Sequence, residues 1–147
     1  MKALGTIITL MLLQGSNMAI AQQGTLASQG SVDITLTEAH NCSPPLANIK
    51  GIRIQGSYQY HQGTGFLTIN QINGQSITPL TLEPLGLAGK HAFGYFTPTP
   101  LNAPGIPNTT LKSLYVDLSL LGIQSGNMVL ANKNNSACQI SSANFIK

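Results

Sequence analysis

The side chains that could perform acid–base or metal chemistry are few in this sequence and are scattered along it. They comprise three histidines and four acids, namely His40, His61, His91, Asp33, Glu38, Glu83 and Asp117. No two histidines have the HxxxH or HExxH spacing that places two metal ligands on one face of a helix. The sequence also lacks a GxSxG nucleophile elbow and a phosphate-binding P-loop. We therefore predict that the protein is not an enzyme and expect no catalytic residue, no metal ligand and no cofactor.

The two cysteines, Cys42 and Cys138, lie far apart in the chain, and neither belongs to a CxxC motif. A reactive or metal-binding thiol would need a second ligand or an activating group nearby, and the sequence offers none. In an oxidising compartment such a pair forms a disulfide. We predict a Cys42–Cys138 bond that ties the first strand to the last part of the chain.

The start of the chain has the three regions of a secretory signal peptide. Lys2 precedes the apolar run Ala3–Leu13, and small residues follow at Ala19 and Ala21. The apolar run is shorter than the about 20 residues that a membrane-spanning helix needs. We therefore predict a signal peptide over 1–21 and a single domain over 22–147 that begins with a flexible leader, 22–29, and has no membrane span after cleavage. The expected location is periplasmic, cell-surface or extracellular.

The composition narrows the expected partners. Only 7% of the residues are charged, and the lysines and Arg53 are too scattered to displace counterions from phosphates. We therefore expect no nucleic-acid partner. A neutral surface rich in hydroxyl and amide groups opposes self-association only weakly, so we expect protein partners or self-assembly.

Alternating hydrophobic residues predict the fold class. In the segment 30–42, Val32, Ile34 and Leu36 alternate with polar residues, and in 51–60 one parity is apolar or aromatic, as half-buried strands require. About seven or eight such runs, separated by turn residues, predict an antiparallel β-sandwich.

The dipeptide Asn73-Gly74 predicts a two-residue hairpin turn, because both residues tolerate positive φ. This turn predicts the cross-strand pairs Ile72–Gln75, Ile69–Thr78 and Leu67–Leu80. Pro79 cannot donate to a ladder, so we expect the hairpin at a sheet edge.

Two later segments allow alternatives. Residues 110–122 fit a helix through Leu111, Leu114 and Leu118, or a strand through the alternation around Leu114. We favour the strand, in which Asp117, like Asp33, lies on a solvated polar face. The four prolines of 98–107 predict an extended surface loop that connects strands, with a polyproline-like ligand for an aromatic groove as the alternative.

The large aromatic side chains are expected mainly in the core. Aromatics at alternate positions can also form a stacking platform for a ligand. The residues that we consider for such ligand contacts are Tyr58, Tyr60, His61 and Tyr95.

The segment 24–42, GTLASQGSVDITLTEAHNC, resembles the mature start of secreted bacterial pilin-like subunits of the chaperone-usher and spore-coat-U-like kind. In that family a leader of small residues precedes an alternating strand that reaches a cysteine. The resemblance implies a β-sandwich subunit without a catalytic site, completed by a strand from a neighbour. We expect a non-enzymatic, exported structural or adhesive subunit of a bacterial surface or pilus-like assembly. The alternative is a monomeric periplasmic or secreted module that binds a protein or carbohydrate through residues 61–65 and 98–107.

Overall fold

The computed structural model describes residues 27–43, 46, 49–61, 64–87, 90–118, 123–132 and 136–142. Within these residues the elements are ten strands: β1 Gln29–Leu36, β2 Glu38–His40, β3 Ile52–His61, β4 Thr64–Ile72, β5 Gln75–Pro84, β6 Ala92–Tyr95, β7 Thr99–Ala103, β8 Ile106–Leu118, β9 Gln124–Ala131 and β10 Ala137–Ser141. The predicted signal peptide, 1–21, and most of the predicted leader, 22–29, lie outside them. Among the described residues, none of the elements is a helix with the length and apolar character needed to span a membrane.

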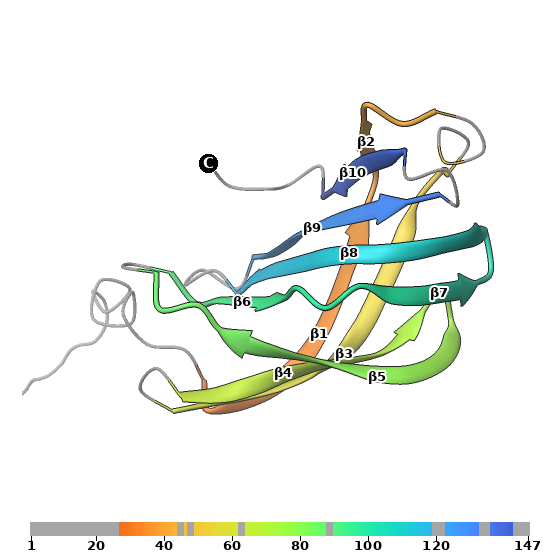
Figure 1. Cartoon of the computed structure of the whole chain (residues 1–147). Coiled ribbons are helices and arrows are strands. Elements are labelled where there is room, and N and C mark those ends of the chain that lie inside the picture. Colours follow the sequence, from red (N-terminus) through yellow and green to blue (C-terminus); the bar gives the residue numbers. More distant parts are fainter. Residues whose placement is uncertain are drawn as a thin grey trace, which may run out of the picture.

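The strands form one curled antiparallel sheet (Figure 1). Its order is β1-β3-β4-β5-β6-β8-β9-β10-β2, with β7 added beside β8. Only Thr37 separates β1 from β2 in the sequence, so one continuous segment supplies both ends of this order. The predicted all-β, antiparallel fold class is confirmed.

The seam where β1 meets the other end of the sheet is closed by hydrogen bonds. The backbone N–H of Thr37 donates to the carbonyl of Ser141 at 2.8 Å. The side-chain amide of Gln124 accepts from the N–H of Asp33 at 3.0 Å and donates to the carbonyl of Ser31 at 3.0 Å. This amide therefore pairs with two backbone groups on the second edge of β1, as a neighbouring strand would.

A single hydrophobic cluster fills the inside of the curled sheet. Its members come from nearly every strand, and the fully buried ones include Leu36, Ile52, Ile54, Leu67, Ile69, Leu82, Phe93, Leu111 and Leu114. The burial of β1 alternates as the sequence predicts, with Val32, Ile34 and Leu36 inside and their neighbours exposed. Removal of this apolar surface from water is the main stabilising term of the fold.

The predicted disulfide is present between Cys42, just after β2, and Cys138 in β10. The Cα atoms lie 4.7 Å apart because β2 and β10 are paired strands. The bond therefore fixes the early end of the chain to the late end at the point where the curled sheet closes.

The β4–β5 hairpin agrees with the prediction at its turn and departs from it farther away. Ile72 opposes Gln75, as predicted, with Asn73 at φ 51° and Gly74 at φ 81°. The predicted partners of Ile69 and Leu67 are wrong: Ile69 opposes Leu80 and Leu67 opposes Leu82. The reason is a bulge, in which the residues 77–79 face a single residue of β4. A bulge leaves residues unpaired, and Pro79, which has no N–H, is one of them.

The prediction of a connecting loop over 98–107 is wrong. This segment contains β7 and the start of β8, joined by a tight turn at Pro104 and Gly105. Prolines are tolerated here because β7 pairs on one side only, with β8, and an edge strand can lose N–H groups on its free side. The additional strands β2 and β7 explain why ten strands are present rather than seven or eight.

The segment 110–118 is a strand, as favoured, while 119–122 lie outside the described residues. The predicted solvated position of Asp117 is wrong, since this residue is only 7% exposed. It lies between Ala92 and Ser125 on the neighbouring strands, and its Oδ2 is 3.9 Å from Nζ of Lys90. Burial, followed by the charge of Asp117, raises the pKa of Tyr115 above its ordinary value.

Candidate functional site

The four residues considered for ligand contacts do not form one site. Tyr58 is 7% exposed and belongs to the core, and His61 is exposed at the end of β3. The ring of Tyr60 meets the rings of His91 and Phe93 edge-on, at centroid distances of 5.1 and 6.3 Å. Tyr95 Oη is hydrogen-bonded to Oγ1 of Thr99 at 2.5 Å. The expectation that aromatic residues serve mainly in packing holds for Tyr58, Tyr60 and Tyr95, which all lie in or against the core cluster.

Apart from Glu38 and His40 on β2, whose Oε1 and Nε2 atoms lie 4.0 Å apart, the described acids and histidines are not paired with one another. Among the side chains that the structure describes, no group of three His, Cys, Asp or Glu residues could hold a metal ion. Asp33 instead pairs with Arg53 on the exposed face of β1 and β3, where Arg53 donates two hydrogen bonds, of 2.9 and 2.6 Å. These bonds and the guanidinium charge hold the pKa of Asp33 below its usual value.

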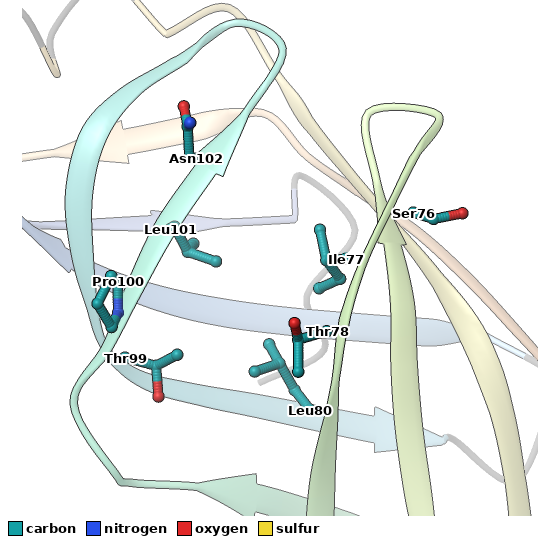
Figure 2. A pocket seen from close by; sticks show the side chains of 8 residues that line it. All are labelled: Ser76, Ile77, Thr78, Leu80, Thr99, Pro100, Leu101 and Asn102. Carbon is teal, nitrogen blue, oxygen red and sulfur yellow. The ribbon is translucent and has the colours of Figure 1, made fainter.

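One opening among the described residues lies between β5 and β7. β5 pairs with β6 only through Glu83 and Pro84, and no strand among the described residues pairs with the rest of this edge. Of the strands that the structure describes, only β8 pairs with β7. Two unpaired strand edges therefore face each other across a cavity of about 180 Å³, which we call the β5–β7 slot (Figure 2).

The floor of the slot is apolar and its rim is polar. Ile77, Leu80 and Leu101 point into the space between the two strands, as Figure 2 shows, and Leu80 and Leu101 are each only 4% exposed. Ser76, Thr78, Thr99 and Asn102 complete the lining together with Pro100. Pro79 of β5 and Pro100 of β7 have no N–H group, so neither residue can donate a main-chain hydrogen bond to an added strand.

Two contacts join the strands beyond the two ends of the slot. At one end β5 and β6 meet through the pair Glu83–Gly94. At the other end Asn73 joins the tips of two hairpins, because its Nδ2 donates to the carbonyl of Pro104 at 2.6 Å. The Oδ1 of the same side chain accepts from the N–H of Arg53 at 2.8 Å. Asn73 thus connects β3, the β4–β5 turn and the β7–β8 turn.

Replacing Asn73 with glycine should remove both of these side-chain hydrogen bonds while keeping a residue that tolerates positive φ. We expect a loss of about 1–3 kcal/mol in the free energy of unfolding, at about 0.5–1.5 kcal/mol per bond. Urea denaturation measures this loss, and hydrogen exchange should show faster exchange at Gly105 and Ile106. The matched variant Asn73→Asp keeps the acceptor for Arg53 but places a carboxylate against the Pro104 carbonyl. Unchanged exchange in both variants would mean that Asn73 does not hold the end of the slot.

The slot was not predicted from the sequence. Its walls come from a hairpin strand and from a segment expected to be a loop, and only the topology brings them together. The one available signal was the presence of proline inside an alternating run, at Pro79, which indicates an edge without a ladder partner.

Comparison of the chain with protein-family models, with curated proteins and with solved structures found no match.

Proposed function

We propose that this protein is a non-enzymatic, exported subunit of a surface or pilus-like assembly, and that subunits join through the β5–β7 slot. In this proposal an extended segment of one copy lies between β5 and β7 of the next. The observation that supports it is the pair of unpaired strand edges facing each other above an apolar floor. An exposed strand edge is a template for pairing with another chain. The disulfide agrees with an oxidising compartment outside the cytosol.

The chemistry of the slot fits strand addition. Main-chain hydrogen bonds to the two edges would supply affinity, and pockets for alternate side chains would supply selectivity. Ile77, Leu80 and Leu101 offer one apolar pocket, and burial of a leucine-sized side chain there would contribute about 1.5–3 kcal/mol. The loss of N–H groups at Pro79 and Pro100 favours a segment that donates N–H groups to the remaining carbonyls.

The segment that we propose for this exchange is the part of the leader before Ser28. The carbonyl of Ser28 already accepts from the N–H of Tyr60 at 2.8 Å, so the intramolecular ladder begins there. Residues 22–27 contain one large apolar side chain, Leu26, between small or polar neighbours. Leu26 would fill the apolar pocket while its neighbours point to the rim.

The proposal is tested with the secreted protein purified from its host, by light scattering after size exclusion and by unboiled electrophoresis. Thr78 lies on the exposed rim of the slot, and Thr78→Arg should abolish heat-sensitive oligomers by placing a charge where the segment must enter. The matched control Ser57→Arg changes an exposed position of β3 and should assemble normally. Deletion of residues 22–27 should have the same effect as Thr78→Arg. Monomers throughout, or equal loss in the control, would contradict assembly through the slot.

One observation also favours the alternative function, a monomeric binding module. Thr99–Asn102, which line the slot, belong to the 98–107 segment predicted for ligand contact, whereas none of the residues of 61–65 does so. A peptide from a different protein would occupy the same slot. The two functions differ in the light-scattering result, because a binding module remains a monomer until its ligand is added.

A further inference from the structure

The side chain of Phe96 is largely exposed to solvent, although its ring lies against the neighbouring strand residue Gly94. Its side chain is 62% exposed, more than the other exposed large hydrophobic residues among those described, Phe66, Leu87 and Ile123. The ring lies against Gly94, which is itself buried. A Cβ added to Gly94 would meet Cε2 and Cζ of Phe96 at 2.7 Å and Cδ2 of Leu85 at 2.9 Å. The ring therefore occupies the place of the missing side chain of Gly94.

This position puts the ring beside a carboxylate. Glu83 of β5 is directly opposite Gly94 of β6, and directly opposed residues have Cβ atoms about 4.5–5.5 Å apart on one face of the sheet. The Phe96 ring fills the Gly94 side of this pair, and Glu83 and Phe96 line the same pocket. No ion pair involving Glu83 occurs within the described part of the chain.

The surroundings form a pocket of about 390 Å³ on the outside of the β5–β6 junction. Its volume lies in the range of small-molecule sites, about 300–1,000 Å³. Besides Phe96 and Glu83, its lining includes Tyr95 and the hydroxyl side chains of Thr81 and Thr97. The described residues that line this pocket include no lysine, arginine or histidine.

We infer that the Phe96–Glu83 pocket binds an organic cation of the ammonium type. The face of an aromatic ring carries negative potential and attracts a cation within about 6 Å of its centroid. The Glu83 carboxylate adds a full negative charge on the same side, and the threonine hydroxyls can accept N–H donors. The bound group is either a free alkylammonium compound or the ammonium of a lysine side chain on a peptide. This site is separate from the β5–β7 slot and does not depend on the assembly proposal.

A neutral ligand should bind this pocket with lower affinity than a cation. A hydrophobic group would gain contact with the ring but would remove water from the Glu83 carboxylate without replacing its hydrogen bonds, which costs free energy. An ammonium group pairs with the carboxylate and retains the contact with the ring. Because Phe96 is largely exposed, the contact with the ring should contribute at the lower end for such pairs, about a two- to fivefold gain in affinity.

The test is a titration of the folded protein followed by NMR of backbone amides, with choline, Nα-acetyl-lysine methylamide, the neutral choline isostere 3,3-dimethylbutanol and methyl glucoside as ligands. We expect at least one of the two cations to shift the amides of Thr81, Phe96 and Thr97, with affinity about fivefold or more above that of the neutral isostere. Tighter binding of choline would identify a free alkylammonium ligand, and tighter binding of the lysine derivative would identify a basic peptide. The affinity should fall with increasing salt.

Variants separate the two parts of the site. Glu83→Gln removes the charge and keeps the size, and Phe96→Leu keeps an apolar group over Gly94 and removes the π face. Each should weaken cation binding about two- to fivefold or more, whereas Phe66→Leu on β4 and Glu38→Gln on β2 should leave it unchanged. The inference would be overturned if the neutral isostere bound as well as the cations or if only methyl glucoside bound. It would also be overturned if neither variant had an effect or if no ligand shifted the amides.

Discussion

Replacing Gly56 with alanine is expected to lower the free energy of unfolding by about 3 kcal/mol or more, the upper part of the range for overpacked sites. A Cβ at this position would lie 1.7 Å from the carbonyl oxygen of Thr68, 2.8 Å from its carbonyl carbon and 2.9 Å from Cα of Ile69. All three atoms belong to the backbone of β4, which is paired on both sides, with β3 and β5. Neither strand can move away without breaking ladder hydrogen bonds.

The effect of Gly56→Ala is measured by urea denaturation of the purified protein, or by loss of folded protein in secreted material if the variant does not accumulate. The control is Gly51→Ala, where the added Cβ would have only an ordinary contact of 3.8 Å with the carbonyl of Leu36. We expect the control to change stability by less than about 1 kcal/mol. The β3–β4 register shifts between Gln55 and Gly56. Similar stability of the two variants would show that β3 and β4 do not approach as closely there as the structure indicates.

Removal of the disulfide is the second change with a large expected effect. The bond closes a loop with a sequence separation of 96, for which the chain-entropy account gives a stabilisation of about 4–5 kcal/mol. Cys138 is also 4% exposed, so Cys138→Ala removes buried sulfur contacts. We expect the double variant Cys42→Ala, Cys138→Ala to be unfolded or only marginally stable, because a domain is typically stable by about 5–15 kcal/mol.

Denaturation of the oxidised protein, the reduced protein and the double variant measures this contribution. Reductant should destabilise the original protein and should not affect the double variant. An unchanged denaturation midpoint after complete reduction, with both thiols alkylated, would refute the prediction. The outcome also bears on the compartment, since a fold that depends on this bond cannot mature where thiols are kept reduced.

The sequence predicted the features that depend on local pattern. The alternation of Val32, Ile34 and Leu36, the turn at Asn73-Gly74 and the strand over 110–118 all follow from spacing that a single segment carries. The disulfide could be predicted because two cysteines allow only one pair.

The predictions that were wrong concern contacts between residues that lie far apart in the sequence. Ile69 opposes Leu80 because a bulge around Pro79 shifts the register, and alternation alone does not indicate where a bulge falls. The segment of β7 was expected to be a loop because Pro100 is compatible with a loop and with an edge strand. It is a strand because it pairs with the long strand β8. Asp117 is buried because Ala92, Ser125 and Lys90 come together around it.

The two candidate sites were beyond prediction for the same reason. Phe96 was grouped with the core aromatics, and its exposure depends on the glycine at position 94 that holds the ring against the outside of the sheet. The slot requires β5 and β7, which are joined in the chain through β6, to diverge after the Glu83–Gly94 pair. Neither arrangement produces a periodic pattern of residues in the sequence.

The continuity of β1 and β2 has a consequence for how the chain reaches its folded state. Among the described strands, β1 and β2 come before all the others in the sequence, yet β2 pairs with β10, which comes after all the others. Contacts of such high sequence separation make folding slow, since loop closure precedes the gain from pairing. Until β10 is available, β2 lacks the strand with which it pairs in the folded structure. Translation of a chain truncated before position 137 would leave it without its final neighbour.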